Sequence, residues 1–249
     1  MSDNHNKVPN PAQGTLLYQK LSFAATEAYK LLRTNVLFAL PDEQKCRVIG
    51  VTSSLRGEGK STTSINLSYT LAETGKRVLL IDADMRLPSV AKKMEIKGEP
   101  GLSNMLVGMS DVQASVQTSG ILDSWFILPA GDIPPNPSEL LGSKQMEKLI
   151  RVFSSQFDFI VVDLPPVNIV TDALVISPLT DGMIVVVRDG YTERSALNNC
   201  VRQLKQANIK IIGFVMSMTK DGFGSYSRYK RYKYYKYYKY SKYYAKDEP

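Results

Sequence analysis

The chain has 249 residues, of which 43% are hydrophobic and 22% are charged, which suits one soluble domain with a substantial core. Cys46 and Cys200 lack metal-ligand spacing, and His5 is the only histidine, so histidine catalysis and histidine metal sites are excluded. No apolar run approaches the roughly 18 residues of a membrane span, and the N-terminus does not resemble a secretion signal. The composition therefore predicts a cytoplasmic protein with reduced thiols.

The net charge of +7 is concentrated at the C-terminus. Residues 226–249 hold eight basic and two acidic residues, a net charge of +6. The preceding residues hold 23 basic and 22 acidic residues, so the body of the protein is almost neutral. This distribution argues against a basic nucleic-acid-binding face on the folded domain.

Apolar patterns and turn residues predict an alternation of strands and helices after a flexible segment, residues 1–20. The continuously apolar strands are typical of a parallel sheet covered on both faces. We therefore predict an α/β fold, with a doubly wound, mainly parallel sheet and helices on both faces. The predicted helices are 23–40, 63–74, 138–153, 171–179 and 192–207, with short helical pieces in 88–124, and the predicted strands are 47–52, 77–84, 125–129, 158–163, 183–187 and 209–218.

A phosphate-binding loop is predicted where the first strand meets its helix, residues 48–62. The sequence departs from the usual G-x-x-x-x-G-K-[ST] pattern at Ser54, which replaces the first glycine. Backbone N–H groups of such a loop cradle phosphate oxygens, and the following helix dipole favours the same anion. Lys60 would reach the β- and γ-phosphates, and Ser61 would ligate Mg²⁺. The candidate nucleotide-binding residues are Ser54, Gly57, Glu58, Gly59, Lys60, Ser61 and Thr62.

Three acids end two of the predicted strands: Asp82, Asp84 and Asp163. The carboxyl ends of parallel strands meet at one edge of a sheet, which is where such folds bind ligands. Asp163 could be an acid that binds the metal. In the Asp82-x-Asp84 pair, one acid could also bind the metal while the other faces an incoming hydroxyl group. Each acid alone could instead be a capping residue at a strand–helix junction.

The C-terminal segment combines tyrosine with lysine and contains almost no aliphatic residue, so it is predicted to be disordered. Such a segment could stack on single-stranded nucleic acid or lie on an anionic membrane. Beside a site suited to hydroxyl phosphorylation, it could instead be the substrate. Its ten candidate phosphorylation sites are Tyr226, Tyr229, Tyr232, Tyr234, Tyr235, Tyr237, Tyr238, Tyr240, Tyr243 and Tyr244.

Together these motifs resemble the bacterial tyrosine kinase family, and in particular the separate kinase chains of Gram-positive capsule and exopolysaccharide synthesis. The resemblance rests on the phosphate loop 53–61, the second acidic motif 79–86, the strand with Pro-Pro 159–166, the segment 135–141 and the tyrosine cluster. It implies ATP and Mg²⁺ as cofactors, with Lys60 on the phosphates. It also implies Ser61, Asp84 and Asp163 around the metal, and Asp82 as base or orienter of the tyrosine hydroxyl.

The resemblance also implies partners. Glu27, Lys30 and Arg33 recur every third residue, a pattern more typical of a solvated helix face, yet they are similar to the family's oligomerisation motif. The motif usually has arginine at the middle basic position, and Lys30 loses its bidentate geometry. A ring-shaped homo-oligomer, a membrane adaptor that holds the kinase at the membrane and a cognate tyrosine phosphatase are implied, and no nucleic acid is expected.

The sequence thus predicts a tyrosine autokinase that phosphorylates its own tail within an oligomer and regulates polysaccharide synthesis. Residues 21–225 would form the kinase domain with the oligomerisation helix, and residues 226–249 the tail. Arg56 and Leu164 depart from the family's common residues without removing a ligand. The alternative is a partition or septum-positioning ATPase of the same fold, but Leu55 stands where those proteins carry a signature lysine.

Overall fold

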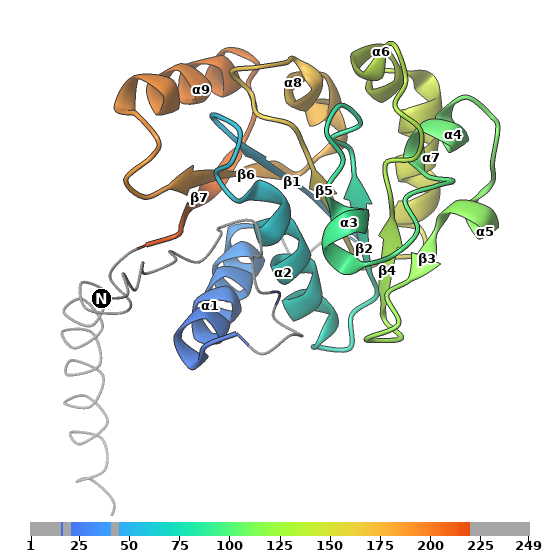
Figure 1. The fold of residues 1–249 in the computed structure, drawn as a ribbon, viewed down its shortest axis with the longest axis horizontal. Coiled ribbons are helices and arrows are strands. Elements are labelled where there is room, and N and C mark those ends of the chain that lie inside the picture. Colours follow the sequence, from blue (N-terminus) through green and yellow to red (C-terminus); the bar gives the residue numbers. More distant parts are fainter. Residues whose placement is uncertain (1–15, 17–20, 41–44, 220–249) are drawn as a thin grey trace, which may run out of the picture. The chain divides into compact units, whose positions relative to one another are not determined.

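The computed structural model describes residues 16, 21–40 and 45–219. Over these residues the core is a seven-stranded sheet in the order β3-β4-β2-β5-β1-β6-β7 (Figure 1). All neighbouring strands are parallel except β3 and β4, which form a short antiparallel pair at one edge. The strands are β1 (Arg47–Ser53), β2 (Val78–Asp82), β3 (Gln117–Thr118), β4 (Trp125–Leu128), β5 (Phe159–Asp163), β6 (Gly182–Arg188) and β7 (Ile211–Ser217).

Helices cover both faces of this sheet. One face packs on α1 (Phe23–Ala39), α2 (Lys60–Ala72) and α3 (Val90–Met94). The other packs on α4 (Leu102–Leu106), α6 (Pro137–Leu141), α7 (Lys144–Ser154), α8 (Asp172–Ile176) and α9 (Arg194–Gln206). Among the described residues, the remaining helices are the short α5 (Val112–Ser115) and the 3₁₀ turn η2 (Ser177–Leu179).

The central strands are buried on both sides, and their side chains alternate between the two layers. In β2, for example, Val78 and Leu80 belong to the core beneath α1–α3, whereas Leu79 and Ile81 belong to the opposite core. This alternation follows from the two-residue repeat of an extended chain. The predicted doubly wound α/β fold is confirmed.

Several predicted helix boundaries differ from the structure, and two of the differences are large. The predicted helix 138–153 is divided into α6 and α7, and Ser143, rather than Ser138, caps the second piece through a bond from Met146 N–H at 3.2 Å. A Cβ atom at Gly142, between the two helices, would lie only 2.7 Å from Cγ1 of Val175, so α8 approaches too closely for another residue. The helix after the phosphate loop begins at Lys60 rather than Thr63, because the loop closes directly into the first helical turn.

The chain's internal contacts divide it into two units, residues 1–217 and residues 218–249. Within the predicted flexible segment 1–20, the structure describes only Leu16, which is buried in the core beneath α1–α3. The predicted boundary at residue 225 lies outside the described residues. Of the helices that the structure describes, none is both long and apolar enough to cross a membrane.

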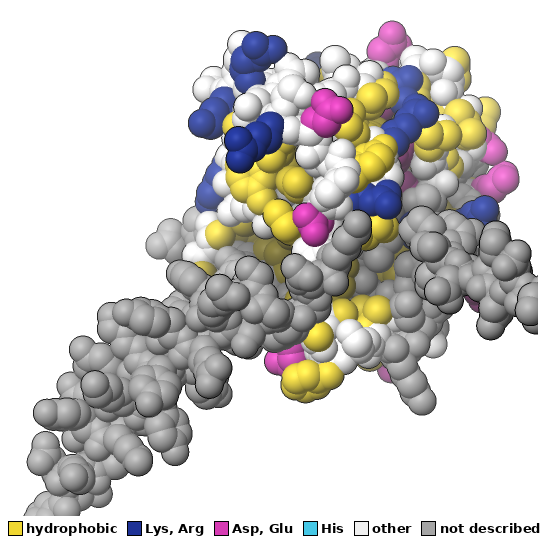
Figure 2. All heavy atoms as spheres, turned by 60° about the vertical axis from the view of Figure 1, so that its left-hand side comes forward, with side chains coloured by type: hydrophobic (Ala, Val, Ile, Leu, Met, Phe, Trp, Pro, Cys, Tyr) yellow, Lys and Arg dark blue, Asp and Glu magenta, His cyan; other side chains and the backbone are white. Residues whose placement is uncertain are grey.

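The face turned forward in Figure 2 carries hydrophobic side chains, with basic and acidic groups interspersed around them. Edge strand β7 exposes Phe214 and Met216, which are 54% and 62% accessible. Lysine and arginine side chains are not gathered into a continuous patch on this face.

Candidate active site

The predicted phosphate loop joins β1 to α2 and turns through two glycines. Gly57 and Gly59 have φ angles of +77° and +93°, in the region that residues with a Cβ atom rarely adopt. A Cβ atom at Gly59 would also lie 3.3 Å from the Ser217 hydroxyl oxygen. These turns open directly into the N-terminus of α2, the geometry that favours an anion. Ser61 is buried and Thr62 half-buried in the first turn of that helix.

The phosphate loop is stabilised by contacts that the sequence patterns did not predict. The Glu58 carboxylate is fully buried, accepts a hydrogen bond of 2.7 Å from the Leu55 N–H, and also accepts the Thr192 hydroxyl. From the ends of β6 and β7, Arg188 donates to the Gly57 carbonyl at 3.1 Å and Ser217 to the Glu58 carbonyl at 2.5 Å. These contacts of the Glu58 side chain hold the loop in shape, and binding of nucleotide by this residue stays a prediction. Ser54, also predicted here, is fully buried.

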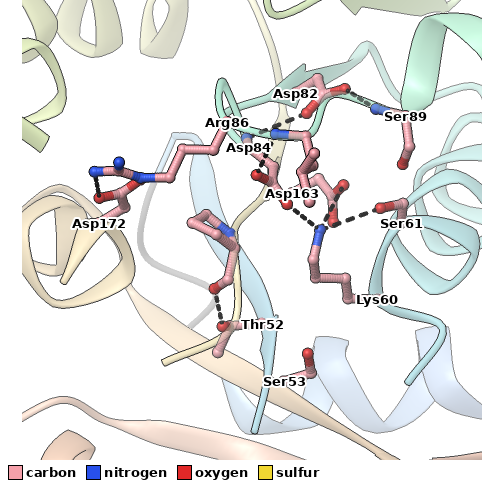
Figure 3. Close-up of polar contacts among 12 residues, drawn as sticks. Thr52, Ser53, Lys60, Ser61, Asp82, Asp84, Arg86, Ser89, Asp163 and Asp172 are labelled. Carbon is pink, nitrogen blue, oxygen red and sulfur yellow. Dashed lines mark hydrogen bonds and ion pairs between the residues drawn. The ribbon is translucent and has the colours of Figure 1, made fainter. Parts of the chain in front are cut away.

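The Lys60 ammonium lies between two acids (Figure 3). Its Nζ atom is 2.7 Å from Asp84 Oδ2 and 3.8 Å from Asp163 Oδ2. Burial alone would lower the pKa of Lys60, but attraction to Asp163 and Asp84 outweighs it and raises the pKa. Lys60 is therefore a fixed positive charge. The structure brings together the lysine and two of the acids that the sequence predicted.

Asp82, the third acid, is fully buried, and both of its carboxylate oxygens accept hydrogen bonds from backbone N–H groups. One carboxylate oxygen accepts from the Asp84 N–H at 3.2 Å, and the other accepts from the Ser89 and Val90 N–H groups at 3.0 Å each. Burial and the neighbouring Asp163 raise the pKa of Asp82 to about 7, although the hydrogen bonds from Val90 and Ser89 and the charge of Lys60 lower it. In this arrangement Asp82 holds the turn after β2 in place.

This acid cluster predicts an unusual dependence of stability on pH. The unfolded chain releases the Asp82 proton near pH 3.8, whereas the folded chain keeps it until about pH 7. The folded state thus binds more protons within that window, so the free energy of unfolding should fall as pH rises, by up to about 1.4 kcal/mol per pH unit for one proton. Urea unfolding of the nucleotide-free protein between pH 4.5 and pH 8 measures this trend. A flat or rising curve across the window would contradict the account.

The acids also fit a magnesium ion. The buried Asp163 Oδ2 atom has no hydrogen-bond partner, while Ser64 donates to the other oxygen at 3.0 Å. Mg²⁺ is usually held by one or two carboxylates together with phosphate oxygens. Asp84, Asp163 and Ser61 could supply such a partial shell. Among the described residues, no group of three or more acidic, histidine or cysteine side chains is arranged to hold a metal by itself.

The residues predicted for oligomerisation lie on α1. Lys30 pairs with Glu27 at 3.0 Å on the partly exposed face of the helix. Arg33 instead donates to the Thr70 carbonyl at 2.7 Å and so ties α1 to α2 within the chain. This contact gives Arg33 a role inside the domain that its spacing did not predict. The ten tail tyrosines lie outside the described residues.

The phosphate loop contains two glycines with positive φ angles and is followed by a lysine, and acids stand at the ends of neighbouring parallel strands. This combination defines a P-loop nucleotide-binding protein. Comparison with known proteins agrees, since the model of the AAA domain family matches residues 46–212. The chain is 38% identical to the tyrosine-protein kinase YwqD of Bacillus subtilis, covering 78% of this chain and 81% of that protein. It is 31% identical to the tyrosine-protein kinase CpsD of Streptococcus agalactiae, with coverages of 80% and 86%. The chain therefore belongs to the bacterial tyrosine kinase family, of the Gram-positive CpsD type.

Solved structures agree with this assignment. The chimerical protein CapA2B2 matches with a TM-score of 0.73 at 33% identity, covering 76% of this chain and 83% of the other. The kinase domain of the Escherichia coli tyrosine kinase ETK matches with a TM-score of 0.73 at 29% identity, with coverages of 79% and 78%. A septum site-determining protein MinD from Pyrococcus horikoshii is similar at a TM-score of 0.58 and 23% identity, over 70% of this chain and 72% of the other. That last likeness shows the fold alone.

Proposed function

We propose that this chain is a protein-tyrosine autokinase that transfers the γ-phosphoryl group of ATP to tyrosines in the tail of a neighbouring copy. The observation that carries the proposal is the placement of Lys60 between Asp84 and Asp163 beside the phosphate loop, in a member of the tyrosine kinase family. The tail supplies ten tyrosines within 24 residues, which is a dense supply of acceptor hydroxyls.

The described residues include candidates for binding the phosphates and for binding Mg²⁺ in such a transfer. The loop N–H groups and the Lys60 ammonium would bind the phosphates, since Lys60 can exchange its carboxylate partners for phosphate oxygens. Asp84, Asp163 and Ser61 would hold Mg²⁺, which neutralises charge on the transferring phosphate when it is bound. Catalysis of this kind depends mainly on positioning and electrostatics rather than on covalent chemistry by the protein.

Asp82 is proposed as the base or orienter for the tyrosine hydroxyl. A pKa of about 7 suits proton exchange at neutral pH, and its bond from the Asp84 N–H links it to the metal side of the site. Both carboxylate oxygens face backbone donors, so direct contact with a tyrosine would require the turn after β2 to open. Without that opening, Asp82 acts by fixing Asp84.

The proposal extends to the setting of the kinase. A membrane adaptor would hold the chain at the inner surface of the membrane, the chain would assemble with copies of itself through α1, and a phosphatase would reverse the modification. Control of capsular or exopolysaccharide synthesis is the process in which such a kinase would act. The family membership and the names of the CpsD relatives support this setting.

Replacing all ten tail tyrosines with phenylalanine tests the acceptor directly. Phosphotyrosine formed from labelled ATP with Mg²⁺ should fall to background, whereas binding of ATP by the domain should be unchanged, because no tail tyrosine lies in the phosphate loop. Mass spectrometry and nucleotide binding measure the two properties. Undiminished tyrosine labelling in this variant would place the acceptors elsewhere and contradict the proposal.

Phosphorylation should also change the assembly. Each phosphate adds about −1.5 to −2 charges, so about three or four phosphates would cancel the tail's net charge of +6. We expect this charge reversal to loosen subunit packing and to produce smaller particles after incubation with ATP, as measured by light scattering. If the variant with ten phenylalanines shows the same ATP-dependent change in size, tail phosphorylation is not its cause.

A further inference from the structure

Arg86 follows Asp84 by two residues, and its side chain extends away from Lys60 toward α8 (Figure 3). Its Nε atom donates to Asp172 Oδ2 at 3.0 Å, and its Nη2 atom donates to Asp172 Oδ1 at 3.2 Å. These two parallel bonds form the forked pairing that arginine makes with a carboxylate. Asp172 is fully buried, so this pairing satisfies a charge that water does not reach.

Ser138 completes a cluster of three side chains. Its hydroxyl accepts from Arg86 Nη2 at 3.0 Å and donates to Asp172 Oδ1 at 2.5 Å. Ser138 belongs to α6 and Asp172 to the first turn of α8, so the cluster ties the turn after β2 to two helices on one face of the sheet. Burial of Asp172 and the closed set of hydrogen bonds fix the direction of the Arg86 side chain.

The turn that carries Arg86 also sets the direction of the Asp84 carboxylate. Asp84 Oδ1 accepts from the Leu87 N–H at 3.1 Å, while its other oxygen contacts Lys60. Arg86 lies between the two residues joined by this bond. A displacement of Arg86 would therefore change the position of the Leu87 N–H and with it the orientation of Asp84.

We propose that Arg86, held by Asp172 and Ser138, is a positioning residue that prepares the Asp84 carboxylate for Mg²⁺. The inference rests on the proposed function only in taking Asp84 as a magnesium ligand. Groups that orient metal ligands without touching the metal themselves typically change metal affinity by about 10- to 100-fold when they are replaced. Arg86 acts through the backbone of the turn, so we expect an effect near the lower limit.

The test is Mg²⁺-dependent binding of a fluorescent ADP analogue to the full chain. Arg86→Lys keeps the charge but loses the fork, Asp172→Asn removes the buried carboxylate charge, and Ser138→Ala removes one hydroxyl. The Mg²⁺ concentration for half-maximal binding should rise about tenfold in the first two variants and less in the third. At saturating Mg²⁺, affinity for the nucleotide should return to within about twofold of wild type, as expected for an orienting effect.

A matched control is available on α7, where Arg151 pairs with Glu147 on the exposed surface. Arg151→Lys should leave the Mg²⁺ requirement unchanged, because surface pairs contribute little. The inference is overturned if the variants of Arg86, Asp172 and Ser138 melt at lower temperatures but keep the Mg²⁺ requirement of wild type. The cluster would then be purely structural. If Asp172→Asn does not fold, Arg86→Lys and Ser138→Ala still decide the question.

The binding assay separates this inference from the proposed function, because no phosphoryl transfer takes place in it. A shifted Mg²⁺ requirement in a protein that never forms phosphotyrosine would support the positioning role and contradict the autokinase. If these variants leave the Mg²⁺ requirement unshifted while the protein does phosphorylate its tail, the positioning role is wrong and the autokinase is supported. If wild type shows no Mg²⁺-dependent binding, the positioning role fails with the metal site.

Discussion

Replacement of Lys60 with methionine should reduce tyrosine phosphorylation about a thousandfold, to near background. The variant loses the ammonium group that would bind the transferring phosphate, and removing one such electrostatic group commonly costs about 10²–10³-fold in rate. It also leaves Asp82, Asp84 and Asp163 without the cation that Asp84 contacts at 2.7 Å. Initial rates of phosphotyrosine formation with labelled ATP measure the loss.

Stability provides the control for this variant. Removing one partner of a buried ion pair typically costs about 3–5 kcal/mol, so Lys60→Met should be less stable near pH 8. The defect should shrink toward pH 5, where the acids can take up protons. Lys60→Arg keeps the charge and should restore more stability than activity, while the exposed Lys205→Met should resemble wild type. Substantial kinase activity in a folded Lys60→Met protein would contradict the assigned role of Lys60.

Replacement of Asp163 with asparagine should make the nucleotide-free protein more stable but abolish its kinase activity. Asp163 is fully buried, and burial raises its pKa despite the attraction of Lys60, so its charged form disfavours folding at neutral pH. Asparagine can still accept the Ser64 hydroxyl without adding a third negative charge to the cluster. Without nucleotide, the variant should therefore be more stable than wild type and melt at a higher temperature.

The same substitution should abolish phosphoryl transfer. Asparagine is a weaker ligand for a hard cation than a carboxylate, and the Mg²⁺ shell would lose one of its two acids. Mg²⁺ with ADP should therefore raise the melting temperature of wild type but scarcely that of the variant, because only the tightly binding protein gains stability from its ligand. Calorimetry with and without Mg²⁺–ADP measures both effects. A lower melting temperature without ligand, or retained stabilisation by Mg²⁺–ADP, would show that Asp163 has another role.

Sequence patterns predicted the parts of the site that follow from chain topology. Strands that are parallel and continuously apolar bring their carboxyl ends to one edge, and this places Asp84 and Asp163 beside Lys60. The loop glycines were predictable for a similar reason, because only their backbone freedom allows φ angles of +77° and +93°. These features depend on local residue type and on the order of the strands.

Other features depend on contacts between distant residues, which one sequence does not reveal. The pairing of Arg86 with Asp172 joins positions 86 residues apart. The close approach of Val175 to Gly142, between α6 and α7, likewise joins distant parts of the chain. The inward direction of Glu58 also depends on Thr192, in the turn between β6 and α9. Asp82 was placed correctly at the sheet edge, but its three backbone donors come from a turn whose shape the residues alone do not specify.

The most direct measurement of the proposed autokinase combines two variant chains, neither of which can phosphorylate itself. One carries Lys60→Met and retains its tail tyrosines, and the other retains Lys60 but has all ten tail tyrosines replaced by phenylalanine. With labelled ATP and Mg²⁺, neither chain alone should form phosphotyrosine, whereas the mixture should label the tail of the Lys60→Met chain. Phosphate release without tyrosine labelling in the mixture, under conditions in which wild type hydrolyses ATP, would contradict the proposal and identify an ATPase.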